Sequence, residues 1–240
     1  MPCRMKPDTI CGANAVDALF ARRPDDVIRL FYATERRDLV GPWCSRLAEA
    51  RRPYRLLPDA ELVKVAGTPH HGGVVAVAKP REIPLLDLRA PPRGNFLLVL
   101  DGIGNPHNLG AIARSAAWFG VPALLLHDIP GAALPSDAAY RTAEGGLEWL
   151  ALHRTRDLPR ALAALAPYYR IVATTLAADA VPPEAIPRDR PLALVLGAEE
   201  HGIRAEVLAA CRRSVRIRGT GRVQSLNVAQ AAAVLLHALT

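Results

Sequence analysis

The 240-residue sequence has almost no lysine, although it is basic. Of its 30 basic residues, only Lys6, Lys64 and Lys79 are lysines, and the other 27 are arginines. Arginine makes planar, bidentate contacts with phosphate groups that lysine cannot make. Together with a net charge of +7 and a pI near 9.7, this composition favours a polyanionic partner.

Patterns typical of metalloproteins, membrane proteins and secreted proteins are also absent. The four cysteines fall at no repeated spacing, and His70-His71, beside two glycines, is more typical of a polar loop than of a ligand pair. We therefore expect reduced thiols and no metal. No apolar run reaches the length of a membrane span, and the N-terminus has no signal-peptide pattern. These absences predict a cytoplasmic protein without a membrane segment.

Two common nucleotide-binding motifs are missing as well. Gly102 and Gly104 follow an apolar run, but a dinucleotide fingerprint needs a third glycine where His107 stands. No Gly-Lys pair occurs anywhere in the sequence, which excludes a P-loop.

A proline-rich stretch divides the chain. Residues 79–95 contain four prolines and mixed charges, so residues 81–94 are predicted to be a linker. Residues 1–80 are predicted to form a small α/β domain, with helices at 13–22 and 42–51 and strands at 27–33, 54–57 and 74–78. Residues 1–93 carry a net charge of +5 and residues 94–240 one of +2, so the smaller domain is the more basic one.

Beyond the linker, in residues 95–240, apolar segments alternate with helical patterns. Strands that are apolar throughout and separated by helices indicate an α/β fold, with a parallel sheet covered by helices on both faces. Such a sheet usually binds its ligand at the carboxyl ends of its strands. We expect strands at 96–100, 123–127, 149–153, 171–175, 192–196 and 215–217, helices at 109–119, 137–145, 158–166 and 205–212, and a final helix after residue 227.

Three loops at that edge carry polar residues with a chemical use. The first presents Asn108 at a helix start and Arg114 two turns later, where its guanidinium either reaches solvent or binds an anion. The second carries Glu199, which can hold a hydroxyl or a cationic group. The alternative is a simple glycine turn at which Glu200 is solvated. The third leads through Ser225 and Asn227 into the last helix, which Asn227 can cap. These five side chains form a candidate site.

Together, the three loops resemble the motifs of the SpoU, or TrmH-like, branch of the SPOUT methyltransferases. The matching stretches are NLGAIARSA, LGAEEHGI and SLNVAQAAA. The resemblance implies S-adenosylmethionine-dependent 2'-O-methylation of a ribose in structured RNA, either tRNA or rRNA. It also implies a C-terminal trefoil knot. The stretches GANAVDALF and HHGGVVAVAKP resemble the ends of the family's small substrate-binding domain, which would capture RNA through its phosphates.

The resemblance also assigns roles to single residues. It implies that Arg114 helps to deprotonate the 2'-hydroxyl. A guanidinium has no free acceptor, so we expect it instead to bind the adjacent phosphate and stabilise the forming alkoxide. Asn108, Glu199, Ser225 and Asn227 would orient the ribose, the cofactor and Arg114. The cofactor would lie against Leu196, Gly197, Ile217, Gly219, Ser225 and Leu226.

The sequence departs from the family pattern in two places. Arg218, Gly219 and Ala229 stand where many members have a proline, a methionine and a serine, and AEGGLE at 143–148 replaces a serine-rich segment. These differences leave the identity of the RNA open. Two alternatives are a non-catalytic RNA-binding protein that retains the fold and a small-molecule methyltransferase. The intact site residues disfavour the first, and the basic N-terminal domain disfavours the second.

Two apolar helices predict a homodimer, as does the resemblance. The sheet cannot cover every apolar residue of the first and last helices of the larger domain, and those expected to be left over are Trp118, Phe119, Leu235, Leu236 and Leu239. Packing across a two-fold axis would remove this apolar patch and bring Arg114 near the partner chain. The alternative is that the N-terminal domain covers these helices in a monomer.

Overall fold

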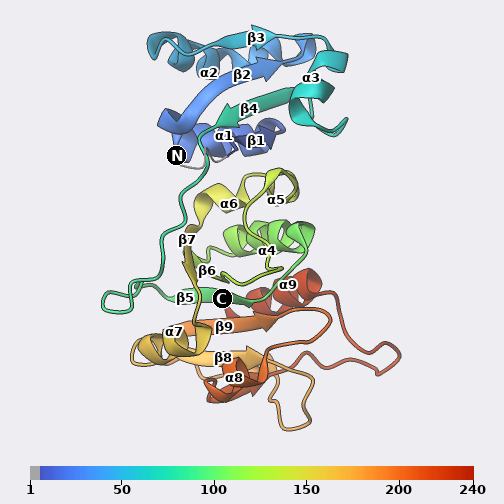
Figure 1. The fold of residues 1–240 in the computed structure, drawn as a ribbon. Helices are drawn as coiled ribbons and strands as arrows, with labels where there is room; N and C mark the ends of the chain where they lie inside the picture. Colours follow the sequence, from blue (N-terminus) through green and yellow to red (C-terminus); the bar gives the residue numbers. More distant parts are fainter. Residues whose placement is uncertain (1–5) are drawn as a thin grey trace.

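The computed structural model describes residues 6–240 and contains two β-sheets, one above the other in Figure 1. Residues 1–5, which include Cys3, lie outside the described residues. The N-terminal part forms the smaller sheet, and a long connecting segment leads from it to the larger one.

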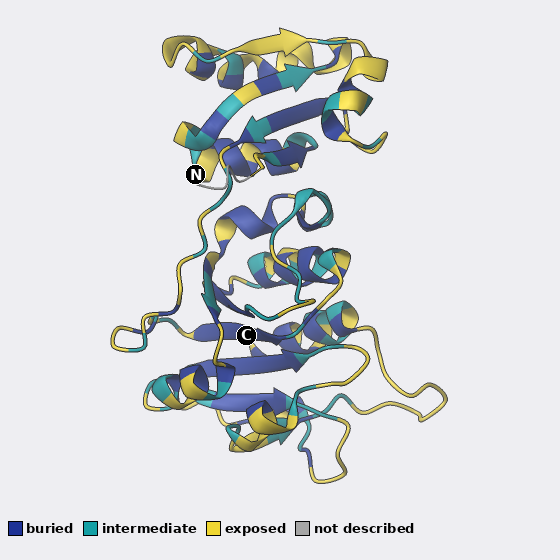
Figure 2. Cartoon of the chain, in the orientation of Figure 1, coloured by how far each residue is buried: buried dark blue, intermediate teal, exposed yellow. Residues whose placement is uncertain are grey.

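The smaller sheet has the strand order β1-β4-β2-β3, in which β4 is antiparallel to β1 and β2, and β3 is parallel to β2. Phe20 and Trp43 stack with their ring centroids 5.6 Å apart, which joins two helices over one face. Figure 2 shows that β3 is exposed, in contrast to the buried β4. The elements are β1 (Asp8–Cys11), α1 (Ala13–Arg22), β2 (Val27–Tyr32), α2 (Arg37–Glu49), β3 (Tyr54–Leu56), α3 (Asp59–Ala66) and β4 (Val74–Ala78).

The larger sheet has six strands in the order β10-β8-β9-β5-β6-β7, and every pair is parallel, as predicted. Its elements are β5 (Phe96–Asp101), α4 (Pro106–Trp118), β6 (Ala123–His127), α5 (Asp137–Ala143), α6 (Gly146–Trp149), β7 (Ala151–Thr155), α7 (Leu158–Leu165), β8 (Arg170–Thr174), β9 (Leu192–Gly197), α8 (Ala205–Ala209), β10 (Arg213–Val215) and α9 (Val228–Leu239).

Helices cover both faces of the larger sheet, because alternate residues of each strand point to opposite sides. Leu98 and Leu100 of β5 pack in one cluster with α4, α5 and α9, whereas Leu97 and Val99 pack in another with α7 and α8. Every residue of β5, and every residue of β9 except Gly197 at its end, is buried (Figure 2).

The predicted strand at 149–153 is shifted in the structure. Residues 146–149 form the short helix α6, and β7 begins only at Ala151. Trp149 was read as the first residue of an apolar strand, but it ends the helix and is 52% exposed. The Arg22 guanidinium lies over its ring, 5.2 Å from the centroid, so the small domain meets α6 here.

The apolar surface expected on α9 is smaller than predicted. Leu235, Leu236 and Leu239 are buried within one chain, at 2%, 0% and 4% exposure. The prediction was wrong because the segment around the short helix Pro183–Ala185 packs on α9 and supplies buried Ile186 to the same core. Trp118, by contrast, is 82% exposed, as expected.

The connecting segment is held against the larger domain. The backbone N–H of Leu86 donates to Arg154 O at 2.8 Å, and Arg154 N–H donates to Pro84 O at 3.0 Å. The Arg81 guanidinium contacts the carbonyls of Leu147 and Leu150 at the end of α6. The segment therefore extends along β7 rather than hanging free.

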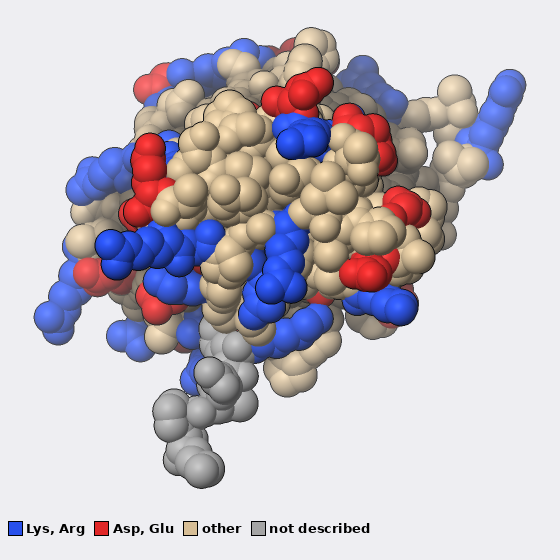
Figure 3. Space-filling model, turned by 90° about the horizontal axis from the view of Figure 1, so that it is seen from above, with Lys and Arg blue, Asp and Glu red and all other residues tan. Residues whose placement is uncertain are grey.

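The small domain carries its charges in a mixed pattern. Figure 3, which looks onto this end of the molecule, shows Lys and Arg side chains around an area of uncharged residues, with Asp and Glu interspersed. Its surplus of positive charge is thus spread over the surface and does not form one continuous basic patch on this face.

Candidate active site

Three polar side chains from three separate segments meet at the carboxyl edge of the larger sheet. Asn227 Nδ2 donates to Asn108 Oδ1 at 3.2 Å and also contacts Glu199 Oε1. Glu199 Oε1 accepts a further hydrogen bond from the backbone N–H of Val228 at 3.4 Å. The structure thus brings together three of the five predicted site residues, from α4, from the turn after β9 and from the start of α9.

Asn227 combines this contact with helix capping. Its Oδ1 accepts from the backbone N–H of Ala229 at 2.9 Å, and the nearby Glu199 carboxylate is well placed for the positive end of the α9 dipole. Asn108, however, does not start α4. Asn105 caps that helix by accepting from His107 N–H at 2.8 Å, and Asn108 lies inside it at 9% exposure. Its bond to Asn227 therefore provides a partner for a buried amide.

Arg114 lies on a different side of α4 from Asn108. The six positions between them correspond to about 9 Å along a helix and about 120° around it. The Arg114 side chain is 57% exposed, and its Nη1 lies 2.9 Å from Glu144 Oε1. Arg114 thus has a protein anion as partner in the free chain, which sequence reasoning missed because Glu144 is distant along the sequence.

The turn that carries Glu144 fits closely between two helices. A Cβ on Gly146 would come 2.8 Å from Arg114 Cα, and a Cβ on Gly145 would come 2.9 Å from Ala18 Cβ of α1. Glu144 and Gly145 both have positive φ angles, of 44° and 92°. Because Gly145 and Gly146 have no Cβ, this turn can contact both α4 and the small domain.

Buried ion pairs join the two domains next to this turn. Glu148 is 4% exposed and lies 2.9 Å from Arg23 Nε and 3.6 Å from Arg81 Nη1. Asp8 Oδ2 accepts from Arg23 Nη2 and from the Tyr140 hydroxyl, both at 3.1 Å. Burial raises the pKa of Asp8, although the charge of Arg23 opposes that shift. The small domain is therefore attached through charged groups that are largely removed from water.

The predicted cofactor residues differ in what they can offer a ligand. Leu196 is 1% exposed, so its side chain belongs to the core. A Cβ on Gly197 would come 2.2 Å from Gly202 C and Ile203 N, because the following loop turns back over it. The close approach expected of a ligand at Gly197 is thus made by the chain itself. Ile217 is partly buried, and Gly219, Ser225 and Leu226 are exposed.

A second buried polar cluster at the same edge was not predicted. Asp101, at the end of β5, is 1% exposed and accepts from the backbone N–H of Arg204 at 2.9 Å, from Arg204 Nη2 at 2.6 Å, and lies 3.0 Å from His127 Nδ1. Burial alone would raise the pKa of Asp101, but the bonds from His127 and Arg204 outweigh it and lower that pKa. The cluster anchors the chain just after the Glu199 loop.

Residues 6–240 contain no group of three or more His, Cys, Asp or Glu side chains arranged to hold a metal ion. Within the same residues, none of the helices combines the length and apolar character needed to cross a bilayer.

Comparison with known proteins matches both parts of the chain. Residues 95–237 match the SpoU rRNA Methylase family, and residues 9–84 match a domain described as RNA 2'-O ribose methyltransferase substrate binding. A protein of Escherichia coli O157:H7, described as uncharacterized tRNA/rRNA methyltransferase YfiF, is 34% identical over 97% of this chain and 68% of its own length. The 23S rRNA (guanosine-2'-O-)-methyltransferase RlmB of Acinetobacter baylyi is 32% identical over 97% of this chain and 96% of its own.

Solved structures show the same fold. The SpoU methyltransferase AviRb from Streptomyces viridochromogenes, in complex with the cofactor AdoMet, superposes with a TM-score of 0.76 at 23% identity, over 98% of this chain and 89% of that one. The parallel sheet, with Asn108, Glu199 and Asn227 in contact at its edge, agrees with this fold. The family match over residues 95–237 and the relative that is 32% identical over 97% of this chain show that the chain belongs to the SpoU rRNA methylase family.

Proposed function

We propose that this chain methylates a ribose 2'-hydroxyl of ribosomal RNA, in the cytoplasm, as a homodimer whose sites use both subunits. As a family member it is an RNA (ribose-2'-O-)methyltransferase, and S-adenosylmethionine is its methyl donor. Relatives named as 23S rRNA methyltransferases match the chain over nearly their whole length, which supports rRNA over tRNA. The meeting of Asn227 with Asn108 and Glu199 is the observation that carries the proposal.

The residues expected to hold the cofactor fit an adenosine-bearing ligand. No hydrogen bond within residues 6–240 involves the backbone of residues 217–226, so its N–H and C=O groups are free. In the same segment, Val223 and Leu226 are 72% and 44% exposed. A ligand with an adenine ring and a ribose could bond to this backbone and cover these apolar side chains. When bound, S-adenosylmethionine supplies an electrophilic methyl group.

The side chains of the candidate site have separate roles in this proposal. Glu199, Asn108 and Asn227 hold the start of α9 against the turn after β9, which fixes the end of the 217–226 loop. Ser225, exposed in that loop, is free to hydrogen-bond the ribose. Arg114 binds the phosphate beside the target ribose and stabilises the negative charge that develops on the 2'-oxygen as its proton passes to solvent water. Orientation of the ribose 2'-oxygen toward the methyl group by these residues would lower the reaction barrier further.

The position of Arg114 supports a site shared between two chains. Within one chain it points away from Asn108 and pairs with Glu144. Trp118, one turn further on the same face of α4, is 82% exposed, and Val234 of α9 is 44% exposed. Packing these apolar side chains against a second copy would bury them and bring each Arg114 toward the Asn227 cluster of the partner. The C-terminal trefoil knot, in which the last segment of this chain would thread through a loop, stays a prediction.

Transfer of labelled methyl from S-adenosylmethionine to separate unmethylated 23S rRNA, 16S rRNA and tRNA tests the proposal. We expect labelling of rRNA by the wild-type protein and none by Arg114→Ala, which should still bind the cofactor. Labelling of tRNA alone would contradict the rRNA assignment. RNA binding without any transfer would instead favour the non-catalytic alternative, and full activity of Arg114→Ala would remove that residue from the mechanism.

A further inference from the structure

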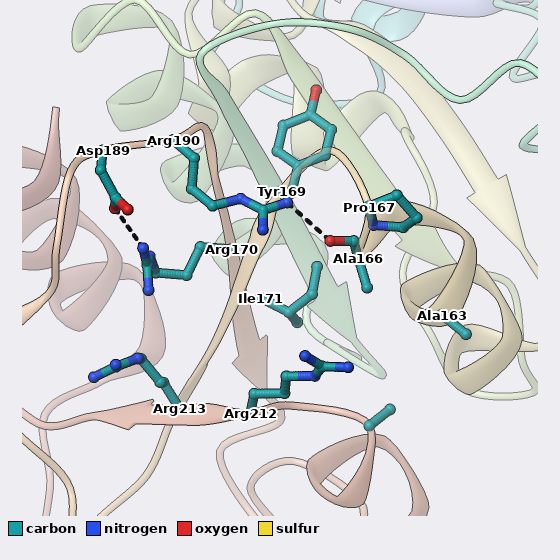
Figure 4. Close-up of a pocket in the computed structure, with 11 residues that line it drawn as sticks. Ala163, Ala166, Pro167, Tyr169, Arg170, Ile171, Asp189, Arg190, Arg212 and Arg213 are labelled. Carbon is teal, nitrogen blue, oxygen red and sulfur yellow. Dashed lines mark hydrogen bonds and ion pairs between the residues drawn. The ribbon is translucent and has the colours of Figure 1, made fainter.

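A pocket rich in arginine lies at the opposite end of the larger sheet from the candidate active site. Its volume is about 880 Å³, and its lining comes from the end of α7, the segment before β9 and the first residues of β8 and β10 (Figure 4). Because these strands are parallel, the pocket lies at their amino ends. One carboxylate, Asp189, faces four arginines: Arg170, Arg190, Arg212 and Arg213.

Two of these arginines have structural roles. Arg190 Nη2 donates to the carbonyl of Ala166 at 2.9 Å, at the C-terminal cap of α7, where a cation is favourable. Arg170 forms an ion pair with Asp189 (Figure 4), and its hydrogen bond lowers the pKa of that carboxyl. Contacts within the protein therefore satisfy the Arg190 guanidinium and the Arg170 nitrogen that faces Asp189.

The other two arginines have no protein partner in the part of the chain that the structure describes. Arg212 and Arg213 are exposed, and neither forms an ion pair or a side-chain hydrogen bond with residues 6–240. Figure 4 shows them on one side of the pocket, with their guanidinium groups pointing in different directions. In addition, Arg170 Nε is buried without an acceptor. Cations gathered in one hollow repel each other unless an anion is bound.

We propose that this pocket binds backbone phosphates of the RNA, as a second contact with the substrate outside the active site. Planar guanidinium groups suit bidentate bonds to phosphate, and such contacts position an RNA without reading its sequence. The six residues of β9 separate the pocket from the Glu199 loop, which corresponds to about 20 Å. Only an RNA that extends past the end of the sheet can reach both places. This inference rests on the proposed RNA substrate and favours a large, structured one.

The test compares the wild-type protein with Arg212→Gln/Arg213→Gln. Binding is measured over a series of salt concentrations to an in vitro transcript of 23S rRNA and to a short hairpin cut from it. For the full transcript, we expect roughly tenfold weaker binding and a salt slope lower by about one to two, as for one or two lost phosphate contacts. Binding to the hairpin should not change. The control, Arg89→Gln/Arg156→Gln, removes two exposed arginines that do not line this pocket.

Unchanged affinity and salt slope for the full transcript, or an equal loss in the control, would overturn the proposal. So would pocket-dependent binding of inorganic phosphate or ADP with no change in RNA affinity, because the pocket would then serve a free phosphate compound. Cofactor binding by the double variant verifies that it is folded. Failure of the wild-type protein to methylate any rRNA would refute the proposed function, while the binding comparison would still decide the role of the pocket.

Discussion

The carboxylate of Glu144 lies 2.9 Å from the guanidinium of Arg114, on the surface of the free chain. An RNA phosphate that binds Arg114 has to compete with this carboxylate for the same guanidinium group. Exposed ion pairs contribute only about 0.2–1 kcal/mol. The competition is therefore strong enough to be measured and weak enough for RNA to displace Glu144.

Replacing Glu144 by glutamine should strengthen the binding of RNA. We expect Glu144→Gln to lower the KM for RNA by up to about fivefold, the factor that corresponds to 1 kcal/mol, with little change in kcat. Steady-state methyl transfer measures both constants. Glu184→Gln is a matched control, because Glu184 is exposed and has no ion pair within residues 6–240. Equal KM values in the two variants would show that Glu144 does not compete with the RNA.

A shared site predicts complementation between two inactive variants. Arg114→Ala and Asn227→Ala should each be inactive, but subunit exchange would create dimers in which one site has two defects and the other has none. An equal mixture should then recover about a quarter of the wild-type activity, since half of its dimers are mixed. Light scattering over a dilution series determines the mass. A mixture that stays inactive would place both residues of a site on one chain.

Removing the buried charge at the domain junction should destabilise the protein. In Glu148→Gln, Arg23 and Arg81 would lose a carboxylate that is 4% exposed. Breaking a buried ion pair from one side costs about 3–5 kcal/mol, so urea unfolding should start at clearly lower concentration. The exposed Glu184→Gln serves again as the control. An unchanged midpoint would mean that the domains hold together without this network.

The Asp101 cluster predicts a specific pH dependence of stability. Because the pKa of Asp101 is lowered from 3.8, its ionised form stabilises the fold above that value, and this stability is lost as the pH falls through the lower pKa. Asp101→Asn should cost about 3 kcal/mol at pH 7, and its difference from the wild type should shrink below about pH 4. Unfolding by urea at several pH values measures this. A constant difference would contradict the assignment, and the exposed Asp179→Asn should show no such trend.

Regular apolar patterns were enough to predict most of the larger domain. The strand Ala123–His127 has the predicted bounds, because a run of apolar residues ends there in polar ones. In the smaller domain β1 and α3 were missed. The first has only four residues and gains its regularity from pairing with β4, a long-range contact with no local signal. The second was overlooked although Leu62 and Ala66 are spaced as on one helical face.

The sequence predicted only those contacts of the candidate site that follow from several segments ending at the same edge of the sheet. Asn108, Glu199 and Asn227 follow parallel strands or begin the helices beside them, so topology brings them together. Glu144 reaches Arg114 through a turn with positive φ angles and tight glycine contacts, which no periodic pattern reveals. A polar residue ending an apolar strand, such as Asp101 or His127, was a signal that could have been used.

The pairing of β5 with β9 in the middle of the larger sheet affects how the chain can fold. The strands β5, β6 and β7 are made first and β8, β9 and β10 later, so the two halves of the sheet meet only along this one seam. Closing it requires contacts between residues far apart in sequence, which slows folding. On the ribosome, the first half would emerge well before its partner. Because Asn108 lies in one half and Glu199 and Asn227 in the other, an incompletely synthesised chain cannot hold a finished site.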